Sequence, residues 1–459
     1  MNAAPGPADI VRSGLCIGCG SCAGRSGAAA ASMQFDAHGL LRPAGPSEWL
    51  RHGPEDFAST CPFSPAALDE DRLAAELFPQ APQRSAGVGR FEAAYVGHVA
   101  EQDFRLRGSS GGMVSWVATE LLRKGMIDAV AHVVAAEQPD REGRFFRYRI
   151  SRSARDVRAG AQSRYYPVEM SEVLEAIAAE PGRYAVVGIP CFIKAVQLLR
   201  RKDPLFRERI RYTLGLFCGH MKSARFVESL ARQMEVELHE VAGVEFRHKA
   251  PERPANWYNA RFTLRDGRTV SQDWWHLADG DWGAGFFMAP ACNFCDDVVA
   301  ETADVSFGDA WVEPYSSDWQ GTNVVMVRSP AVAQLIDDAL AAGRLRLEVV
   351  DDGFVAQTQA AGLRQRREGL AYRLARRSSG VPPRKRVAPD ARSPAARRKL
   401  IYLTRRAIST WSHRMFRLSR ATGSTALYLR WARVATLLYH ALTYHRGPLG
   451  QIVRRLGLR

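Results

Sequence analysis

Apolar and polar positions in the middle of the chain predict strands that alternate with helices. Short apolar runs between turn residues, typical of buried strands, occur at residues 91–100, 127–135, 184–191, 211–217 and 323–328. Helical periodicity follows at residues 113–124, 171–179, 192–201, 223–234 and 330–342. Residues 243–275 alternate like antiparallel strands, with a hairpin turn at Asp266-Gly267. This order predicts an α/β (α+β) core.

The two ends of the chain lack this alternation. Residues 1–65 show little regular periodicity, and residues 66–90 are typical of a short helix followed by a linker. After the core, residues 376–398 contain Val-Pro-Pro-Arg-Lys-Arg and predict a flexible basic linker. Residues 399–420 and 424–445 are again helical in period. We therefore expect a small domain at 1–65, a linker at 66–90, a core domain at 91–345 and a basic, largely helical extension at 346–459.

Composition narrows the class of protein. The length of 459 residues and the hydrophobic content of 46% fit a globular protein of more than one domain. The first residues have no apolar segment of a signal peptide, and no apolar run reaches the roughly 18 residues of a membrane span. Eight cysteines are too few for a disulfide scaffold and favour metal ligands in a reducing compartment. We expect a cytoplasmic protein.

Charge is distributed unevenly. Residues 361–459 contain 24 of the 63 Lys and Arg but two of the 48 acidic residues, so this segment is strongly basic and the remainder mildly acidic. Basic residues interleaved with Trp and Tyr suit an anionic membrane surface, so residues 376–459 are a candidate for peripheral attachment at the inner face of the membrane. The alternative is a pair of C-terminal helices with a solvated basic face, or helices that dock onto a partner. Nucleic acid is the weakest candidate, because no nucleic-acid motif is present.

The first cysteine group is Cys16-x-x-Cys19-x-x-Cys22, with Cys61-Pro62 as the next cysteine. Three thiols at this spacing, completed by a Cys-Pro, are the ferredoxin-type signature of a 4Fe-4S cluster, so we expect residues 1–65 to form a ferredoxin-like cluster domain. A zinc site with four cysteines is the alternative, although zinc sites usually pair two C-x-x-C motifs.

The second cysteine group comes from three places in the core. Cys191 and Cys218 each follow a predicted strand, and the ends of neighbouring parallel strands share one edge of a sheet. Cys292 and Cys295 form a C-x-x-C motif. Eight cysteines thus divide into two sets of four, which predicts two cuboidal clusters. Zinc, or a buried structural role for Cys191 and Cys218, remains open for the second set.

A glycine-rich turn precedes the helix predicted at residues 113–124. Ser109, Ser110, Gly111 and Gly112 lie where free backbone N–H groups and hydroxyls could hold an anionic or polar ligand. The turn alone favours the simpler interpretation, in which Ser109 or Ser110 caps the helix.

The residues that carry these patterns also occur together in a known family. Roughly from residue 12 to residue 330, the chain resembles the coenzyme F-420 hydrogenase/dehydrogenase beta-subunit family, which includes 7-hydroxymethyl chlorophyll a reductase. The resemblance rests on the order of several motifs: the first cysteine run with Cys61-Pro62, Ser109–Gly112, Gly125-Met-Ile-Asp128, Gly188-Ile-Pro-Cys191, Phe217-Cys-Gly-His220, Phe246-Arg-His-Lys249, Cys292-x-x-Cys295-x-Asp297, and Ala303-Asp304 to Gly308-Asp309.

The resemblance implies an iron–sulfur flavoprotein that binds FAD and two 4Fe-4S clusters. Carried over by position, Ser109, Ser110, Gly111 and Gly112 would lie against the flavin. Ser163, Arg164 and Tyr165 match a Ser-Lys-Tyr motif with Arg in place of Lys. Lys249 would face flavin or substrate, and His220 is a candidate proton donor, with a structural histidine as the alternative.

Three functions are compatible with these observations. The first is an oxidoreductase that reduces or oxidises a small organic substrate or a deazaflavin coenzyme, using an electron donor such as ferredoxin or a partner redox subunit. The second is a non-catalytic electron-transfer subunit of a larger complex. The third is a zinc-stabilised adaptor that acts through its basic tail.

Overall fold

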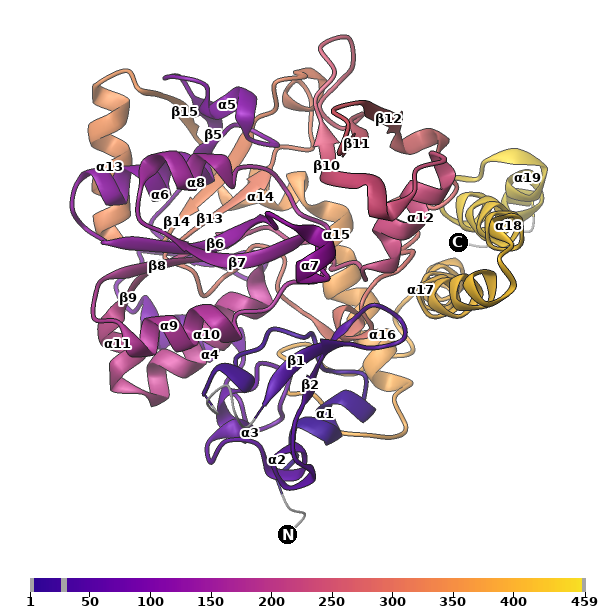
Figure 1. The fold of residues 1–459 in the computed structure, drawn as a ribbon, viewed down its shortest axis with the longest axis horizontal. Helices are drawn as coiled ribbons and strands as arrows, with labels where there is room; N and C mark the ends of the chain where they lie inside the picture. The colour runs from indigo at the N-terminus through magenta and orange to yellow at the C-terminus, as the bar shows by residue number, and fades with distance from the viewer. Residues whose placement is uncertain (1–3, 26–30, 456–459) are drawn as a thin grey trace.

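The computed structural model describes residues 4–25 and 31–455. Its centre is an eight-stranded mixed sheet in the order β15-β5-β14-β13-β9-β8-β6-β7 (Figure 1). Neighbours among β13, β9, β8 and β6 pair in parallel, whereas β7, β14, β5 and β15 pair antiparallel. The strands are β5 (Ala93–Val99), β6 (Ala129–Ala135), β7 (Phe146–Ser151), β8 (Tyr184–Gly188), β9 (Ile210–Leu216), β13 (Val305–Asp309), β14 (Asn323–Val327) and β15 (Leu345–Val349).

Helices cover both faces of this sheet (Figure 1). One face carries α5 (Phe104–Arg107), α6 (Met113–Arg123), α8 (Ala154–Ala159) and α13 (Pro330–Ala341); the other carries α9 (Ser171–Ala179), α10 (Pro190–Lys202) and α11 (Pro204–Arg209). Trp116 and Leu335 are buried in the core of the first face, and Phe192 and Leu174 in that of the second. The α/β core and the positions of its principal helices and strands are confirmed.

A second, three-stranded antiparallel sheet lies beside the core, as the alternating pattern of residues 243–275 predicts. It consists of β10 (Val241–His248), β11 (Asn259–Leu264) and β12 (Thr269–Asp273), and α12 (Arg225–Gln233) packs against it through Phe226 and Leu230. The short α7 (Pro139–Glu142) precedes β7.

The N-terminal segment packs directly on the central domain. Its elements are α1 (Pro7–Arg12), β1 (Ser32–Phe35), β2 (Leu41–Ala44), α2 (Ser47–His52), α3 (Phe57–Thr60), α4 (Glu70–Leu77), β3 (Gln83–Ser85) and β4 (Gly89–Phe91). Ile10, Leu15 and Ile17 belong to the same buried cluster as Phe192 of α10. This cluster spans the expected boundary between the N-terminal domain and the core. The division of the chain into four parts therefore stays a prediction.

The C-terminal segment is largely helical, with α14 (Asp352–Thr358), α15 (Ala360–Arg366), α16 (Glu368–Ala375), α17 (Ala396–Thr422), α18 (Thr425–Tyr444) and α19 (Gly447–Arg455). The last three project from one side of the molecule (Figure 1). Across the described ranges, no helix combines the length and apolarity that a bilayer crossing requires.

The expectation of a flexible linker at residues 376–398 is wrong. Lys385 pairs with Asp296 at 3.0 Å, and both side chains are buried. Arg386 pairs with Glu301 and with Asp71 of α4. Basic residues in this run neutralise buried carboxylates of the core, so the segment is held in place by charge, although residues 376–395 form no regular element.

Candidate metal centres

The first four cysteines line one cavity. Cys16, Cys19 and Cys22 lie on the loop after α1, and Cys61 directly follows α3; together with apolar neighbours they surround an empty volume of about 390 Å³, part of it open to solvent. The loop curls tightly at Gly18, where φ is +76° and an added Cβ would lie 2.6 Å from the Leu41 carbonyl oxygen. The structure thus brings Cys61 to the other three thiols across the intervening hairpin.

The other four cysteines line a second cavity, with an empty volume of about 250 Å³ that includes space open to solvent. Cys191 lies in the first turn of α10, immediately after β8, and Cys218 follows β9. Cys292 lies in the 3-10 helix η4 (Pro290–Phe294), and Cys295 comes directly after it. The parallel pairing of β8 with β9 therefore places two of these thiols at one sheet edge.

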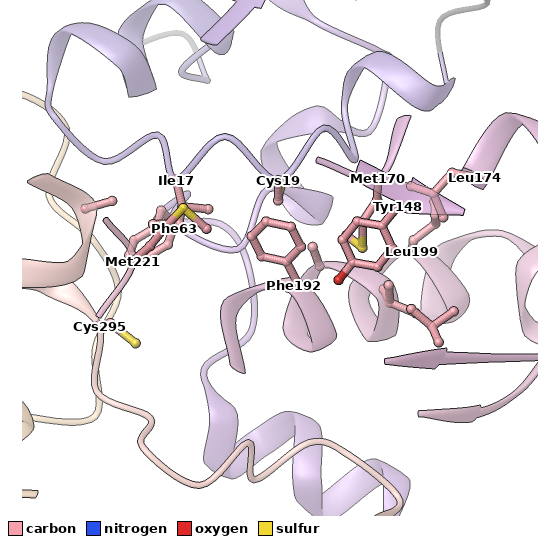
Figure 2. Packing of buried hydrophobic residues seen from close by; sticks show 14 of the residues in the cluster. Ile17, Cys19, Phe63, Tyr148, Met170, Leu174, Phe192, Leu199, Met221 and Cys295 are labelled. Atoms are coloured by element: carbon pink, nitrogen blue, oxygen red, sulfur yellow. The ribbon is translucent and has the colours of Figure 1, made fainter. Parts of the chain in front are cut away.

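The two cavities adjoin one another. Ile17 and Phe63 line both of them. Figure 2 shows these two side chains grouped together, with Cys19 on one side and Cys295 on the other. One layer of apolar side chains therefore separates the two sets of thiols. Within the described ranges, no three His, Cys, Asp or Glu side chains are arranged to hold a single metal ion.

Burial disfavours ionisation of these thiols. It raises the pKa of Cys19 to about 11 and that of Cys61 to about 12, and it raises the pKa of Cys191 and Cys295 as well. Metal ions bind the ionised thiolate and not the neutral thiol. Four thiolates in one buried site would therefore need a cationic centre to hold them together. The set of four thiols in each site fits a cluster of several metal atoms.

Arg366, the last residue of α15, is the one cation that lines the second cavity among the described residues. Its side chain is buried, and its two terminal nitrogens donate to backbone carbonyls of the cysteine loops: Cys292 O at 3.2 Å, Cys295 O at 3.4 Å, Cys218 O at 3.1 Å and Gly219 O at 2.6 Å. Burial alone would lower the pKa of Arg366, but the negative charge of the neighbouring thiolates raises it. Arg366 therefore joins the two loops and supplies a fixed positive charge.

Backbone and charged groups complete the second site. The Met221 N–H donates to Cys292 Sγ at 3.3 Å, an interaction that stabilises a thiolate. Behind Cys295, Asp296 is buried, and its pKa is lowered chiefly by the charge of Lys385, despite burial. The tail segment thus contributes to the support of the second cysteine loop.

The residues predicted to face a flavin lie together at a different place. Ser109 Oγ accepts a hydrogen bond from Ser163 N at 2.8 Å, which joins the glycine turn to the 163–165 segment. Lys249 Nζ donates to the Ser110 carbonyl at 3.2 Å, and to the carbonyls of Arg105 at 2.6 Å and Gln320 at 2.5 Å. Three separate parts of the chain are therefore brought into contact.

The interpretation of Ser109 or Ser110 as a helix cap is wrong. The N-cap of α6 is Gly112, and Met113 N donates to the Asn323 side-chain oxygen at 3.1 Å. Ser110 Oγ instead donates to the Thr322 carbonyl at 2.9 Å. Asn323 lies in β14, far from α6 in the sequence, and accepts the hydrogen bond of a free backbone N–H at the start of the helix. A local sequence pattern cannot reveal this contact.

The glycine turn does not form an open cradle for a phosphate or a flavin ring. An added Cβ at Gly111 would lie 2.7 Å from the Gly97 carbonyl, and one at Gly112 would lie 2.6 Å from the Phe104 carbonyl. The glycines thus permit close packing of the chain on itself. Since the Ser109 and Ser110 hydroxyls and the Lys249 ammonium also have protein partners, the fit of this turn to FAD is incomplete.

A row of aromatic rings connects this region to the second cysteine set. The ring centroids of Tyr165 and Trp282 lie 4.5 Å apart, and Trp282 stacks on His220 at 4.1 Å. His220 lies two residues after Cys218 and is buried, with no hydrogen-bond partner at either ring nitrogen among the described residues. Burial lowers the pKa of His220 well below its usual value, so its ring is neutral at pH 7. A neutral ring is a poor source of an acidic proton.

Arg164 lies beside these residues. Its guanidinium donates to the Gln162 side chain at 3.0 Å and to the Ala161 carbonyl at 3.2 Å, and it lies 4.9 Å from the centre of the Phe146 ring. Burial lowers its pKa to about 10. These contacts are with its own loop and the sheet core, and its expected part in flavin binding stays a prediction.

Lys249 provides a pH test of this region. Burial, followed by the charges of Arg247 and Arg105, lowers its pKa to about 7. Between about pH 7 and about pH 10.4 the unfolded chain therefore holds more protons than the folded one, and stability rises with pH. Compared with Lys249→Met, the wild-type unfolding free energy should increase across this window, by at most about 1.4 kcal/mol per pH unit. Chemical denaturation at several pH values measures this, and a constant or falling difference would contradict it.

Two parts of the site escape the sequence patterns. Arg366 lies in the run Arg364-Gln-Arg-Arg367, which has the appearance of a solvated charged segment, and no motif distinguishes it. Trp282 lies in an irregular segment between β12 and η4, and its aromatic side chain is the only feature in the sequence that points to a role in the site.

Comparison with known proteins gives a consistent result. Residues 94–175 match the N-terminal model, and residues 182–353 the C-terminal model, of the family described as "Coenzyme F420 hydrogenase/dehydrogenase, beta subunit". A coenzyme F420-dependent sulfite reductase from Methanocaldococcus jannaschii is 22% identical over 318 residues, covering 65% of this chain and 43% of that protein. The chain thus spans less than half the length of this relative.

Among solved structures, a chain of the F420-reducing [NiFe] hydrogenase complex from Methanosarcina barkeri is similar at 15% identity and a TM-score of 0.49. The similarity covers 64% of this chain and 96% of that one.

Proposed function

Because the chain belongs to the coenzyme F420 hydrogenase/dehydrogenase beta-subunit family, we propose that it is an iron–sulfur flavoprotein oxidoreductase. It would pass electrons between two 4Fe-4S clusters and FAD, and reduce or oxidise a small organic substrate or a deazaflavin coenzyme. The observation that carries this proposal is the pair of adjoining cavities, each lined by four thiols.

The two cysteine sets have separate parts in this proposal. Cys16, Cys19, Cys22 and Cys61 would hold the outer cluster, and Cys191, Cys218, Cys292 and Cys295 the inner one. A bound 4Fe-4S cluster supplies one-electron transfer. Ile17 and Phe63 exclude water from the space between the two sites and keep them one side-chain layer apart. Arg366 holds two loops of the inner site and offsets its negative charge.

The position of FAD rests on the family and on the gathering of Ser109, Ser163 and Lys249, with Tyr165 in the same region. These side chains would bound one end of the flavin site. No reaction step is assigned to them, because the turn itself is packed against the chain. Trp282 and His220 occupy the space between Tyr165 and the Cys218 loop, and they are the aromatic groups that connect the two regions.

The main alternative is an electron-transfer subunit without its own substrate. The match covers 43% of the sulfite reductase relative, so the activity of that whole protein is not carried over to this chain. A zinc-stabilised adaptor is the less supported alternative, because zinc sites usually pair two C-x-x-C motifs, whereas Cys16, Cys19 and Cys22 form a triple run.

Anaerobic purification of the full chain tests these possibilities. The proposal expects broad absorption near about 400 nm, about eight irons per chain and bound flavin. Colourless protein that contains only zinc would refute it. Reduced coenzyme F420 and dithionite-reduced viologen are then offered in separate reactions, with flavin reduction as the readout. Turnover of a small acceptor by the isolated chain supports an enzyme, whereas reduction without turnover of any acceptor supports the electron-transfer subunit.

A further inference from the structure

Exposed apolar side chains are concentrated on the three C-terminal helices. Of the 15 large hydrophobic residues that are exposed in the described chain, 11 lie between residues 400 and 452. Scattered single exposures are normal on a protein surface, but a concentration of this kind marks an interaction surface. We call this set the outer helical face: Leu400, Leu403, Trp411, Leu418, Leu427, Val434, Leu437, Leu438, Tyr444, Leu449 and Ile452.

This exposure follows the helical period. On α17, Leu400, Leu403, Trp411 and Leu418 recur at intervals that keep them on one side of the helix. On α18, Leu427, Val434 and Leu438 do the same. The opposite sides of both helices are buried against the core. The exposed apolar residues of α17 and of α18 therefore lie along one side of each helix.

The hairpin is firmly attached to the core by polar as well as apolar contacts. Tyr428 Oη donates to Asp279 at 2.8 Å, and His440 lies 2.6 Å from the Asp281 carboxylate. Ser409 Oγ donates to the Met288 carbonyl at 3.0 Å. These contacts fix which side of each helix is turned outward, so the apolar residues cannot be buried by a simple rotation of the helices.

The charge of this region has a single sign. Residues 391–459 contain no Asp or Glu. Exposed arginines stand among the apolar residues, and Arg414 lies over the Trp411 ring at 5.2 Å. Arg406, Arg417, Arg430 and Arg433 are exposed as well. An occupant of this surface must accept both leucine side chains and an uncompensated positive charge.

We propose that α17, α18 and α19 attach the protein to the surface of an anionic lipid bilayer. Apolar side chains would enter the boundary between headgroups and acyl chains, and the arginines would bind the acidic headgroups. A nucleic acid would use the arginines but leave the leucines in water. A protein partner would need an acidic rim around an apolar patch. A bilayer accepts leucine side chains in its apolar layer and arginines at its acidic headgroups.

The bilayer-binding helices also contact the segment that supports the redox site. Arg405 of α17 donates to the Gly283 carbonyl at 2.7 Å, next to Trp282, and Thr436 of α18 donates to the Ala278 carbonyl at 3.1 Å. Attachment would therefore hold the 278–292 segment, including Cys292, close to the membrane. This inference does not rest on the proposed redox function, since lipid binding is measured without turnover.

Vesicle sedimentation of the full-length chain tests the proposal. The protein should pellet with vesicles of phosphatidylcholine containing about 30% phosphatidylglycerol, and at least about tenfold less with phosphatidylcholine alone. Raising NaCl from about 0.1 M to about 0.5 M should reduce binding several-fold, because it screens the arginines. Equal binding to both vesicle types, or absence of binding to the anionic ones, would overturn the proposal.

Two pairs of variants separate the apolar and charged contributions. Val434→Glu with Leu437→Glu should weaken binding to anionic vesicles by about tenfold or more, and so should Arg430→Glu with Arg433→Glu. Two control variants change an exposed apolar residue and an exposed basic residue outside the three C-terminal helices. They are Val349→Glu on β15 and Lys202→Glu at the end of α10, and both should bind vesicles like the wild type. Circular dichroism confirms that each variant is folded. Retained binding by both helix variants, or equal loss in the control variants, would refute the outer helical face as the contact.

Discussion

Replacement of Cys295 with serine is expected to remove the inner cluster and leave the outer one in place. The iron content should fall from about eight to about four per chain, because serine is a poor ligand for iron and each cuboidal cluster needs four thiolates. Cys295 lines the second cavity and does not line the first. Flavin reduction by an external one-electron donor should slow strongly, since the path through the inner site is lost.

A neighbouring substitution provides the control. Asn293 lies between Cys292 and Cys295, and its side chain donates to the Pro290 carbonyl at 3.3 Å. Asn293→Ser leaves all eight thiols in place and should keep about eight irons. Because metal binding is coupled to folding, Cys295→Ser should also lower the thermal midpoint. Full iron content in Cys295→Ser would show that this residue is not a ligand.

Replacement of Arg366 with glutamine should lower the reduction potential of the inner cluster. Its guanidinium is the one cation lining that cavity in the described chain, and the thiolates raise its pKa. Loss of a positive charge makes addition of an electron less favourable. At an effective dielectric constant of about 20, a unit charge about 8 Å away is worth about 2 kcal/mol, which corresponds to on the order of 100 mV for one electron.

Three variants separate the charge of Arg366 from its hydrogen bonds. Arg366→Gln also leaves buried carbonyls unpaired, so the unfolding free energy should fall by about 2–4 kcal/mol. Arg366→Lys keeps the positive charge, so the reduction potential of the inner cluster should stay close to that of the wild type. Its unfolding free energy should still fall in part. Arg364→Gln, on the exposed side of the same helix, should change neither. Redox titration monitored by EPR measures the potential, and an unchanged inner-cluster potential in Arg366→Gln would refute the electrostatic role.

The parts of the site that sequence patterns predict are those with a fixed chemical spacing. C-x-x-C runs bring thiols together locally, and Cys191 and Cys218 follow strands whose parallel pairing places their ends side by side. The alternation of apolar runs with helical segments likewise defines the central sheet. These features depend on backbone geometry that neighbouring residues impose.

The parts that were missed depend on contacts between distant segments. Arg366 and Lys385 belong to a basic stretch that resembles a solvated tail, yet both are buried because cysteine-loop carbonyls and Asp296 lie opposite them in the fold. Similarly, Asn323 caps α6 from a strand about 210 residues away. A single sequence carries no record of these pairings.

The most direct test of two adjoining clusters is EPR spectroscopy of the fully reduced, anaerobic protein. Two reduced clusters separated by Ile17 and Phe63 should together give about two spins per chain, with spectra broadened or split by their magnetic interaction. The Cys295→Ser variant should give about one spin per chain with a simple, unsplit spectrum. A wild-type spectrum of one isolated cluster, or two that do not interact, would contradict the arrangement.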